Sequence, residues 1–181
     1  MLILVIILMD TKLAAEFNKQ IQEEFYSAYL YLSMSAFAAS LNYDGLANWF
    51  KVQFLEEMDH GQGFLQYLLR RGVQVELFEI AKPEKSFGKT VVNMFAAALK
   101  HEQHITTRIN LLYDIALKVK DYAAVEFLRW YVNEQVEEEE NATRFDLRMQ
   151  QVKDIPGALL MLDKELLARA YVPAVIPGAT N

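Results

Sequence analysis

The chain has no cysteine among its 181 residues, and it has only seven glycines and four prolines. Without cysteine it cannot form disulfides, zinc–thiolate sites, iron–sulfur clusters or a thiol nucleophile. Few turn residues, in a chain that is 53% hydrophobic, favour long helices over a sheet protein. This length suits a single domain (1–181) that buries a substantial core.

Excess positive charge and long apolar runs are also missing. The net charge is −6, and the sequence has neither a basic stripe nor a glycine-rich phosphate loop, so we expect no nucleic-acid partner. A membrane-spanning helix needs about 20 apolar residues, and the run at 1–9 is too short, so we expect no membrane partner. The run also lacks the basic start and cleavage site of a signal peptide. We therefore expect a cytoplasmic protein.

Residues 1–9 form an apolar N-terminal extension with two open interpretations. The segment can be an ordered arm that packs on another subunit. Alternatively, translation starts at Met9, and the residues before it do not belong to the protein. We favour the second interpretation.

Apolar residues recur at alternating steps of four and three, which predicts an all-α fold. The expected helices cover about 10–40, 46–71, 89–118 and 121–152, so the bundle spans 10–152. Residues 73–88 lack the pattern and can stretch roughly 50 Å, enough to follow a helix of roughly 40 Å. This permits a four-helix bundle with one long crossover. A short fifth helix at 156–170 and an extended tail at 171–181 complete the chain.

In each of the four expected long helices, the residues at these steps form a row, here called the seam, that faces the core of the bundle. Each seam has a carboxylate at a position where an apolar residue is expected. The seam carboxylates are Glu24, Glu57, Glu102 and Glu138. Burying even one unpaired carboxylate costs several kcal/mol, so four at matching depth require cations. No lysine or arginine falls on the seams near them, which predicts a bound metal. The alternative is that misplaced registers produce four unrelated polar interruptions.

The residue types favour iron as the metal. Glu57 and His60 are three residues apart on one helix face, so both can reach the same ion. Carboxylates with one imidazole suit redox-active iron better than zinc or calcium. Two irons bridged by one glutamate explain why four carboxylates share a small volume. The assignment is Glu24 and His60 on one iron, Glu57 bridging, Glu102 on the second iron, and Gln135 and Glu138 from the last helix.

Other residues beside the seams have two interpretations each. Tyr31, two turns after Glu24, is either an electron or hydrogen-bond donor beside the metals or a core tyrosine with a satisfied hydroxyl. Glu56, Glu134 and Glu137 lie about 100° to one side of the seams. They form either an adjoining, wetter iron site or a solvated acidic face.

Two histidines and two glycines complete the candidate residues. His101 and His104 flank Glu102 off its face, and we expect them at the surface. Gly61 and Gly63 inside the second helix each weaken it by about 1 kcal/mol. They either loosen the wall beside His60 or allow a close approach by a neighbouring helix.

These motifs resemble the prokaryotic non-haem ferritins from Leu13 to about Leu167. The distinctive stretches are EEFYSAYLYLSMSAF, FLEEMDHGQGF, ALKHEQHITTRIN, FLRWYVNEQVEEE and LDKEL. By this resemblance the di-iron ligands are Glu24, Glu57, His60, Glu102 and Glu138, with Gln135 beside the second iron. A third iron site falls on Glu56, Glu134 and Glu137, and the tyrosine near the site is Tyr31.

Two related families fit the sequence less well. Bacterioferritins and rubrerythrins have a second Glu–x–x–His on the last bundle helix, where this chain offers Gln135 and Glu138 without a histidine. Met58 occupies the haem-binding place of bacterioferritins, but non-haem relatives also have methionine there, so no haem is expected. Rubrerythrins add a cysteine-ligated iron domain, which a chain without cysteine cannot form.

The resemblance implies an iron-storage ferritin with ferroxidase activity. Such a protein oxidises Fe(II) with dioxygen or hydrogen peroxide and keeps it as a ferric mineral in a hollow homo-oligomeric cage, normally of 24 subunits. One rival is a small di-iron oxidase or peroxidase that holds about two irons per chain and stores no mineral. Another is a non-catalytic scaffold whose glutamates pair with lysine or arginine.

Overall fold

A computed structural model describes residues 9–179, and all regular structure in that range is helical. The elements are α1 (Thr11–Ser40), α2 (Asp44–Arg70), the 3-10 turn η1 (Val91–Asn93), α3 (Met94–Lys118), α4 (Tyr122–Val152) and α5 (Pro156–Leu166). None of the helices in this range is long and apolar enough to cross a membrane. Both interpretations of the N-terminal run concern residues 1–8, which lie outside the described residues.

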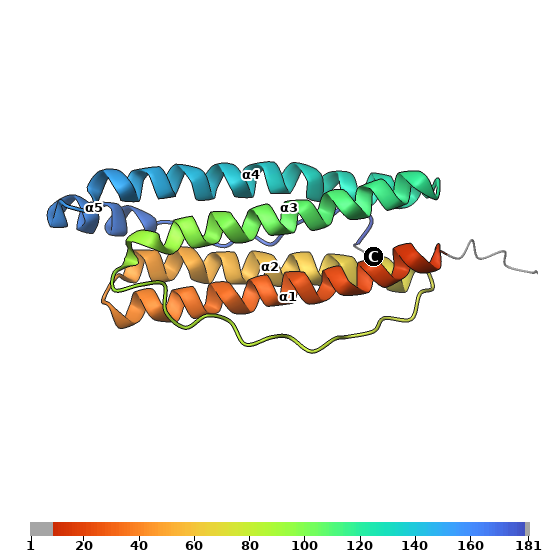
Figure 1. Cartoon of the computed structure of the whole chain (residues 1–181), viewed down its shortest axis with the longest axis horizontal. Coiled ribbons are helices and arrows are strands. Elements are labelled where there is room, and N and C mark those ends of the chain that lie inside the picture. The colour runs from red at the N-terminus through yellow and green to blue at the C-terminus, as the bar shows by residue number, and fades with distance from the viewer. Residues whose placement is uncertain (1–8, 180–181) are drawn as a thin grey trace, which may run out of the picture.

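The four long helices lie side by side, and the segment between α2 and α3 runs along the bundle (Figure 1). It follows α1, where the side chain of Asn18 accepts the N–H of Glu76 at 2.8 Å and Ser33 donates to the carbonyl of Glu84 at 2.5 Å. Because this crossover returns the chain to the starting end of α2, α3 runs parallel to α2. The predicted all-α bundle with one long crossover is confirmed.

Local side-chain chemistry sets the helix ends. The Asp10 carboxylate accepts the N–H groups of Lys12 and Leu13 at 3.0 and 3.1 Å, which makes Asp10 the N-cap of α1. Gly72 follows α2 in the left-handed conformation at φ 69°, where glycine has no steric penalty. The predicted start of the third helix at 89 was too early. Thr90 is extended and caps the turn η1, so α3 begins only at Met94.

The core consists of two apolar clusters at opposite ends of the bundle, separated by a polar layer. The first apolar cluster includes Phe17, Phe64, Leu112 and Phe127. The second apolar cluster includes Met34, Phe50, Phe95 and Met149. Each buried side chain of this size stabilises the fold by about 1.5–3 kcal/mol. The clusters therefore hold the four helices in register on both sides of the polar layer.

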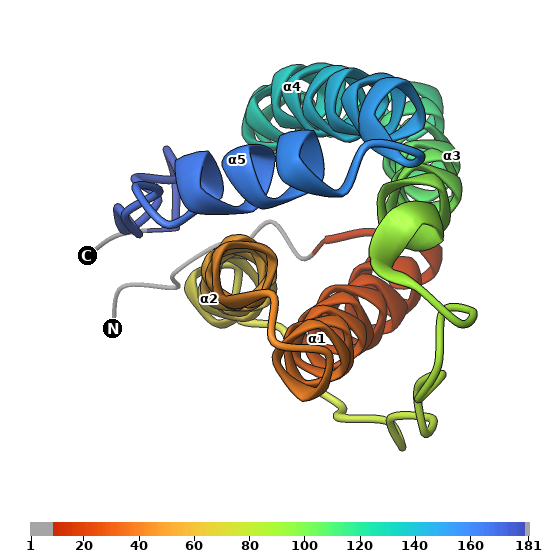
Figure 2. The ribbon, with the colours of Figure 1, turned by 90° about the vertical axis from the view of Figure 1, so that its left-hand side faces the viewer.

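The chain after α4 packs on the side of the bundle between α2 and α4 (Figure 2). Asp163 of α5 accepts the N–H of Leu46 at 2.8 Å near the start of α2. A Cβ at Gly45 would lie 1.6 Å from the carbonyl oxygen of Asp163, so only glycine allows this approach.

The fifth helix is shorter than predicted, and the tail is held against the bundle. The helix ends at Leu166 rather than 170, where the side-chain amide of Asn48 donates to the carbonyls of Leu166 and Arg169 at 3.2 and 2.9 Å. Residues 167–179, here called the C-terminal segment, then follow α2, and Ile176 is only 3% exposed. The prediction of an extended tail was right about its lack of helix, but it missed this packing.

Candidate metal centre

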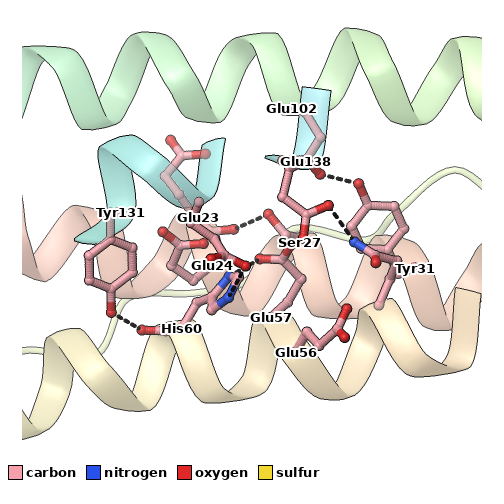
Figure 3. A network of polar contacts seen from close by, with 12 residues as sticks. Glu23, Glu24, Ser27, Tyr31, Glu56, Glu57, His60, Glu102, Tyr131 and Glu138 are labelled. Atoms are coloured by element: carbon pink, nitrogen blue, oxygen red, sulfur yellow. Dashed lines mark hydrogen bonds and ion pairs between the residues drawn. The ribbon is translucent and has the colours of Figure 1, made fainter. Parts of the chain in front are cut away.

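The polar layer collects the predicted carboxylates from all four long helices. Glu24 of α1, Glu57 of α2, Glu102 of α3 and Glu138 of α4 are all at most 5% exposed. Their side chains point toward one another in the middle of the bundle (Figure 3). The four predicted seam positions therefore share one depth in the structure.

One half of the layer is already compact enough to hold a metal ion. One donor atom from each of Glu24, Glu57 and His60 lies within 4.8 Å of the other two. His60 Nδ1 is 3.4 Å from Glu57 Oε2, as expected for residues three positions apart on one helix face. Two carboxylates with one imidazole are a donor set that fits iron.

The other half of the layer is held by neutral hydrogen-bond donors. Glu102 accepts the hydroxyl of Tyr31 and, at 3.2 Å, Nε2 of Gln135. Glu138 accepts Nε2 of Gln53 at 2.8 Å. Glu102 and Glu138 do not belong to the compact group. The structure thus brings Tyr31 and Gln135 to the centre as donors to Glu102, and this hydrogen bond of Tyr31 is compatible with both interpretations of its hydroxyl.

Burial makes the layer electrostatically costly when all its carboxylates are charged. Burial, and then the neighbouring Glu57, raises the pKa of Glu24 to about 8. Burial, and then Glu102, raises the pKa of Glu138 to about 8. The pKa values of Glu57 and Glu102 are raised well above their usual range, again first by burial. Without cations these groups retain protons at neutral pH, and a metal ion that binds there displaces them.

Two glutamines beside the layer were not assigned a role by sequence reasoning. Gln20 donates to Glu24 at 2.9 Å from one turn earlier in α1, and Gln53 donates to Glu138 across the bundle. Both glutamines are fully buried. The available signal was their spacing, since each lies four residues before a seam glutamate. Tyr131 also supports the centre, because its hydroxyl donates to the carbonyl of His60 at 2.8 Å.

The three adjoining glutamates do not form an equally compact group. Glu134 Oε1 is 3.8 Å from His60 Nε2, and Glu137 is exposed. Glu56 Oε2 is 2.6 Å from Arg169 Nη2, an ion pair that sequence reasoning missed because Arg169 lies outside the seams. Burial raises the pKa of Glu56, whereas Arg169 and then His60 lower it.

Of the two flanking histidines, His101 was predicted wrongly and His104 correctly. His101 is half-buried between α1 and α3, with Nε2 2.7 Å from Ser27 Oγ, and burial lowers its pKa to about 4. His104 is exposed and lies 3.0 Å from Glu23.

Gly61 and Gly63 in the middle of α2 allow close approach by neighbouring segments. A Cβ at Gly61 would lie 2.6 Å from the ring of Phe25. A Cβ at Gly63 would lie 2.4 Å from the hydroxyl of Tyr131 and 2.6 Å from Ile176. The close-approach interpretation of both glycines is therefore the one the structure supports.

Comparisons with known proteins match most of the chain to one family. The family model of the ferritin-like domain matches residues 14–151. The bacterial non-heme ferritin of Staphylococcus aureus (strain USA300) is 34% identical over 164 residues, covering 91% of this chain and 98% of its own length. That of Staphylococcus haemolyticus is 35% identical over 154 residues, covering 85% and 92%.

Solved structures of an archaeal protein are similar throughout the fold. An open-pore ferritin from the hyperthermophilic archaeon Archaeoglobus fulgidus is 37% identical, with a TM-score of 0.88 over 90% of this chain and 99% of that one. An engineered closed form of the same ferritin is 36% identical, with a TM-score of 0.88 over 91% and 99%.

Proposed function

This chain belongs to the ferritin family, and from that premise we propose that it is an iron-storage protein with ferroxidase activity. The family membership confirms the resemblance found in the sequence. The oxidation of Fe(II), the use of particular ligands and the storage of a ferric mineral are the proposal.

The compact group of Glu24, Glu57 and His60 is the observation that supports the proposal most strongly. Its donor atoms lie within 4.8 Å of one another in the buried middle of the bundle. The hydrogen-bond partners of Glu24, Glu102 and Glu138 are glutamines and a tyrosine, not lysines or arginines. This argues against the scaffold alternative, in which basic side chains neutralise the glutamates.

We assign two ferrous ions per chain as the substrate of this centre. Glu24 and His60 hold one ion, Glu57 bridges, and Glu102 and Glu138 hold the other. Gln135 and Tyr31 orient Glu102 through their hydrogen bonds. Each ferrous ion loses one electron, and dioxygen takes up both electrons and two protons to give hydrogen peroxide. With hydrogen peroxide as oxidant, the same two electrons and two protons give two water molecules.

We further propose a cytoplasmic homo-oligomeric cage, normally of 24 subunits, that stores the ferric product as mineral. Apolar side chains on α5 are exposed in the single chain, with Met161 at 76% and Leu160 at 59%. Exposed apolar surface of this kind favours contact with further copies. The similarity to ferritins over nearly the whole chain supports the same assembly.

Aerobic iron loading tests the proposed function. Excess Fe(II) is added to the purified protein, and ferric iron retained per chain is counted after gel filtration. Hundreds of irons in a large assembly are the expected result. About two irons per chain in a small oligomer would favour the di-iron oxidase or peroxidase, and no retained iron would favour the scaffold.

A further inference from the structure

A single arginine from the C-terminal segment occupies the edge of the metal centre. The guanidinium of Arg169 lies 4.4 Å from the ring centre of Trp49 and donates to the carbonyl of Trp49 at 3.2 Å. Its Nη2 donates to Glu56 Oε2 at 2.6 Å and also to Oε1 of Gln53. One cation thus binds an aromatic face, a backbone carbonyl, an amide and a carboxylate.

The fold itself holds this arginine in place. Two residues later, the hydroxyl of Tyr171 donates to Asp59 at 2.6 Å, and the N–H of Ala174 donates to the same carboxylate oxygen at 2.9 Å. Ile176 then packs where Gly63 leaves room. Isolated surface ion pairs contribute little because both side chains must be ordered. Here the segment is already ordered along α2, so Arg169 is presented to Glu56 in a defined position.

The arginine is connected to the proposed di-iron residues through one glutamine. A guanidinium only donates hydrogen bonds, so the side-chain oxygen of Gln53 faces Arg169 and its Nε2 faces Glu138. The chain of contacts therefore runs from Arg169 through Gln53 to Glu138. This places the positive charge against the centre rather than at a remote surface.

We propose that Arg169 is a specificity-determining residue whose guanidinium takes the place of a third metal ion at Glu56. The centre then accepts two metal ions per chain, not the three that the family resemblance implies. A metal ion at Glu56 would meet a positive charge bound to the same carboxylate, and like charges at this range repel strongly in a half-buried site. The inference rests on the proposed function, because it assumes that Glu24, Glu57 and His60 bind metal.

Zinc binding to the assembled, metal-free protein tests the inference without any redox step. Arg169→Gln removes the charge and keeps an amide donor, and Arg169→Lys is the matched control that keeps the charge. By calorimetry, we expect two Zn²⁺ per chain for the wild type and for Arg169→Lys. Arg169→Gln should gain a third Zn²⁺, bound at least tenfold more tightly than any third ion in the wild type. Adding Glu56→Gln to Arg169→Gln should abolish that gain.

A second measurement keeps Arg169 in place and so does not depend on the folding of its variants. In a Trp130→Phe background, the remaining tryptophan fluorescence reports Trp49, on which Arg169 stacks. Emission should stay constant while two Zn²⁺ bind, and it should change only if high Zn²⁺ concentrations force a third ion in and displace the guanidinium. No third ion at any concentration would also support exclusion. A third Zn²⁺ bound with unchanged emission would contradict it.

The outcomes separate this inference from the proposed function. If the wild type neither binds Zn²⁺ nor oxidises Fe(II), the proposed function fails and the inference fails with it. If the wild type binds two Zn²⁺ and oxidises Fe(II), but Arg169→Gln binds Zn²⁺ as the wild type does, only the role of Arg169 is overturned. A wild type that binds three Zn²⁺ with similar affinities overturns it equally.

Discussion

The two apolar clusters and the polar layer between them come from the same four helices but depend on opposite conditions. Phe17 and Phe64 in the first apolar cluster are fully buried, with ring centres 5.3 Å apart, and their burial stabilises the fold at any pH. Glu24 and Glu57 are buried as deeply, but their charged forms destabilise the fold unless protons or cations neutralise them. The apolar clusters therefore stabilise the bundle. The polar layer destabilises it when its glutamates are charged and no cation is bound.

Removing the central glutamate should have the largest effect on activity. Glu57→Ala should reduce the rate of Fe(II) oxidation at least about 100-fold, since even weaker changes around a metal cost 10–100-fold. The metal-free variant should unfold at the same temperature as the wild type or higher, because a buried acid has gone. Stopped-flow absorbance and thermal unfolding measure the two effects, with exposed Glu140→Ala as control. An unchanged oxidation rate would disprove the site assignment.

Truncating a ring in the first apolar cluster should show the opposite pattern. Phe17→Ala should destabilise the protein by about 3–5 kcal/mol, through lost burial and a residual cavity. Because the apolar cluster does not titrate, the loss should be the same at pH 5 and pH 8. Denaturant unfolding of the metal-free protein measures it, and Leu147→Ala, which truncates a 58%-exposed side chain, is the control. A loss that changes strongly with pH would contradict the comparison.

The contribution of the polar layer to the free energy of unfolding of the metal-free protein should fall as pH rises. Glu24 has a pKa of about 8 in the folded protein and an ordinary value of 4.5, so the folded state retains the proton longer. Its stabilising contribution is complete below about pH 4.5 and is lost as pH rises toward 8, by about 1.4 kcal/mol for each pH unit. Glu24→Gln cannot titrate and should lack this loss.

Glu16 and Asp121 have lowered pKa values, so their contributions to stability change with pH in the opposite sense. Both groups are present in the wild type and in Glu24→Gln, so the difference between the two proteins reports the contribution of Glu24 alone. Denaturant midpoints of both proteins, measured with chelator at pH 5 and pH 8, should diverge in favour of Glu24→Gln at the higher pH. Parallel pH curves would show that Glu24 does not retain its proton in the fold.

The smallest effect is expected from the hydroxyl of Tyr31. Tyr31→Phe removes a hydrogen bond to Glu102 and leaves the ring packing against Phe50 intact. We expect stability to change by about 1 kcal/mol, the usual net value of one hydrogen bond. Oxidation should slow by about 10-fold, the low end of the range for losing a hydrogen-bond partner of a metal ligand, since Glu102 itself remains. Exposed Tyr29→Phe is the control, and equal oxidation rates in both variants would leave Tyr31 as a core tyrosine only.

Sequence reasoning could predict the features that depend on local periodicity. The seam positions of Glu24 and Glu138, the cap at Asp10 and the stop at Gly72 all follow from helical spacing and terminal chemistry. It could not predict Arg169, because its partner Glu56 is 113 residues away and the segment between Leu166 and Ile176 has no periodic pattern.

Other differences have the same physical origin. The α3 start shifted because the side chain of Thr90 stabilises a turn that helical periodicity does not describe. His101 was expected at the surface because helix geometry places it off the seam of Glu102. In the structure, this direction points His101 into the contact between α1 and α3, where its Nε2 forms a hydrogen bond with Ser27 Oγ. Helical periodicity thus does not predict which side chains pair between helices.

The most direct test of the central claim is anomalous diffraction from crystals of the metal-free protein soaked with Zn²⁺. We expect two metal peaks per chain inside the bundle, one among Glu24, Glu57 and His60 and one beside Glu102 and Glu138. We expect no peak at Glu56 while Arg169 is present. An empty polar layer in crystals that bind Zn²⁺ elsewhere would contradict the claim that this layer exists to bind metal.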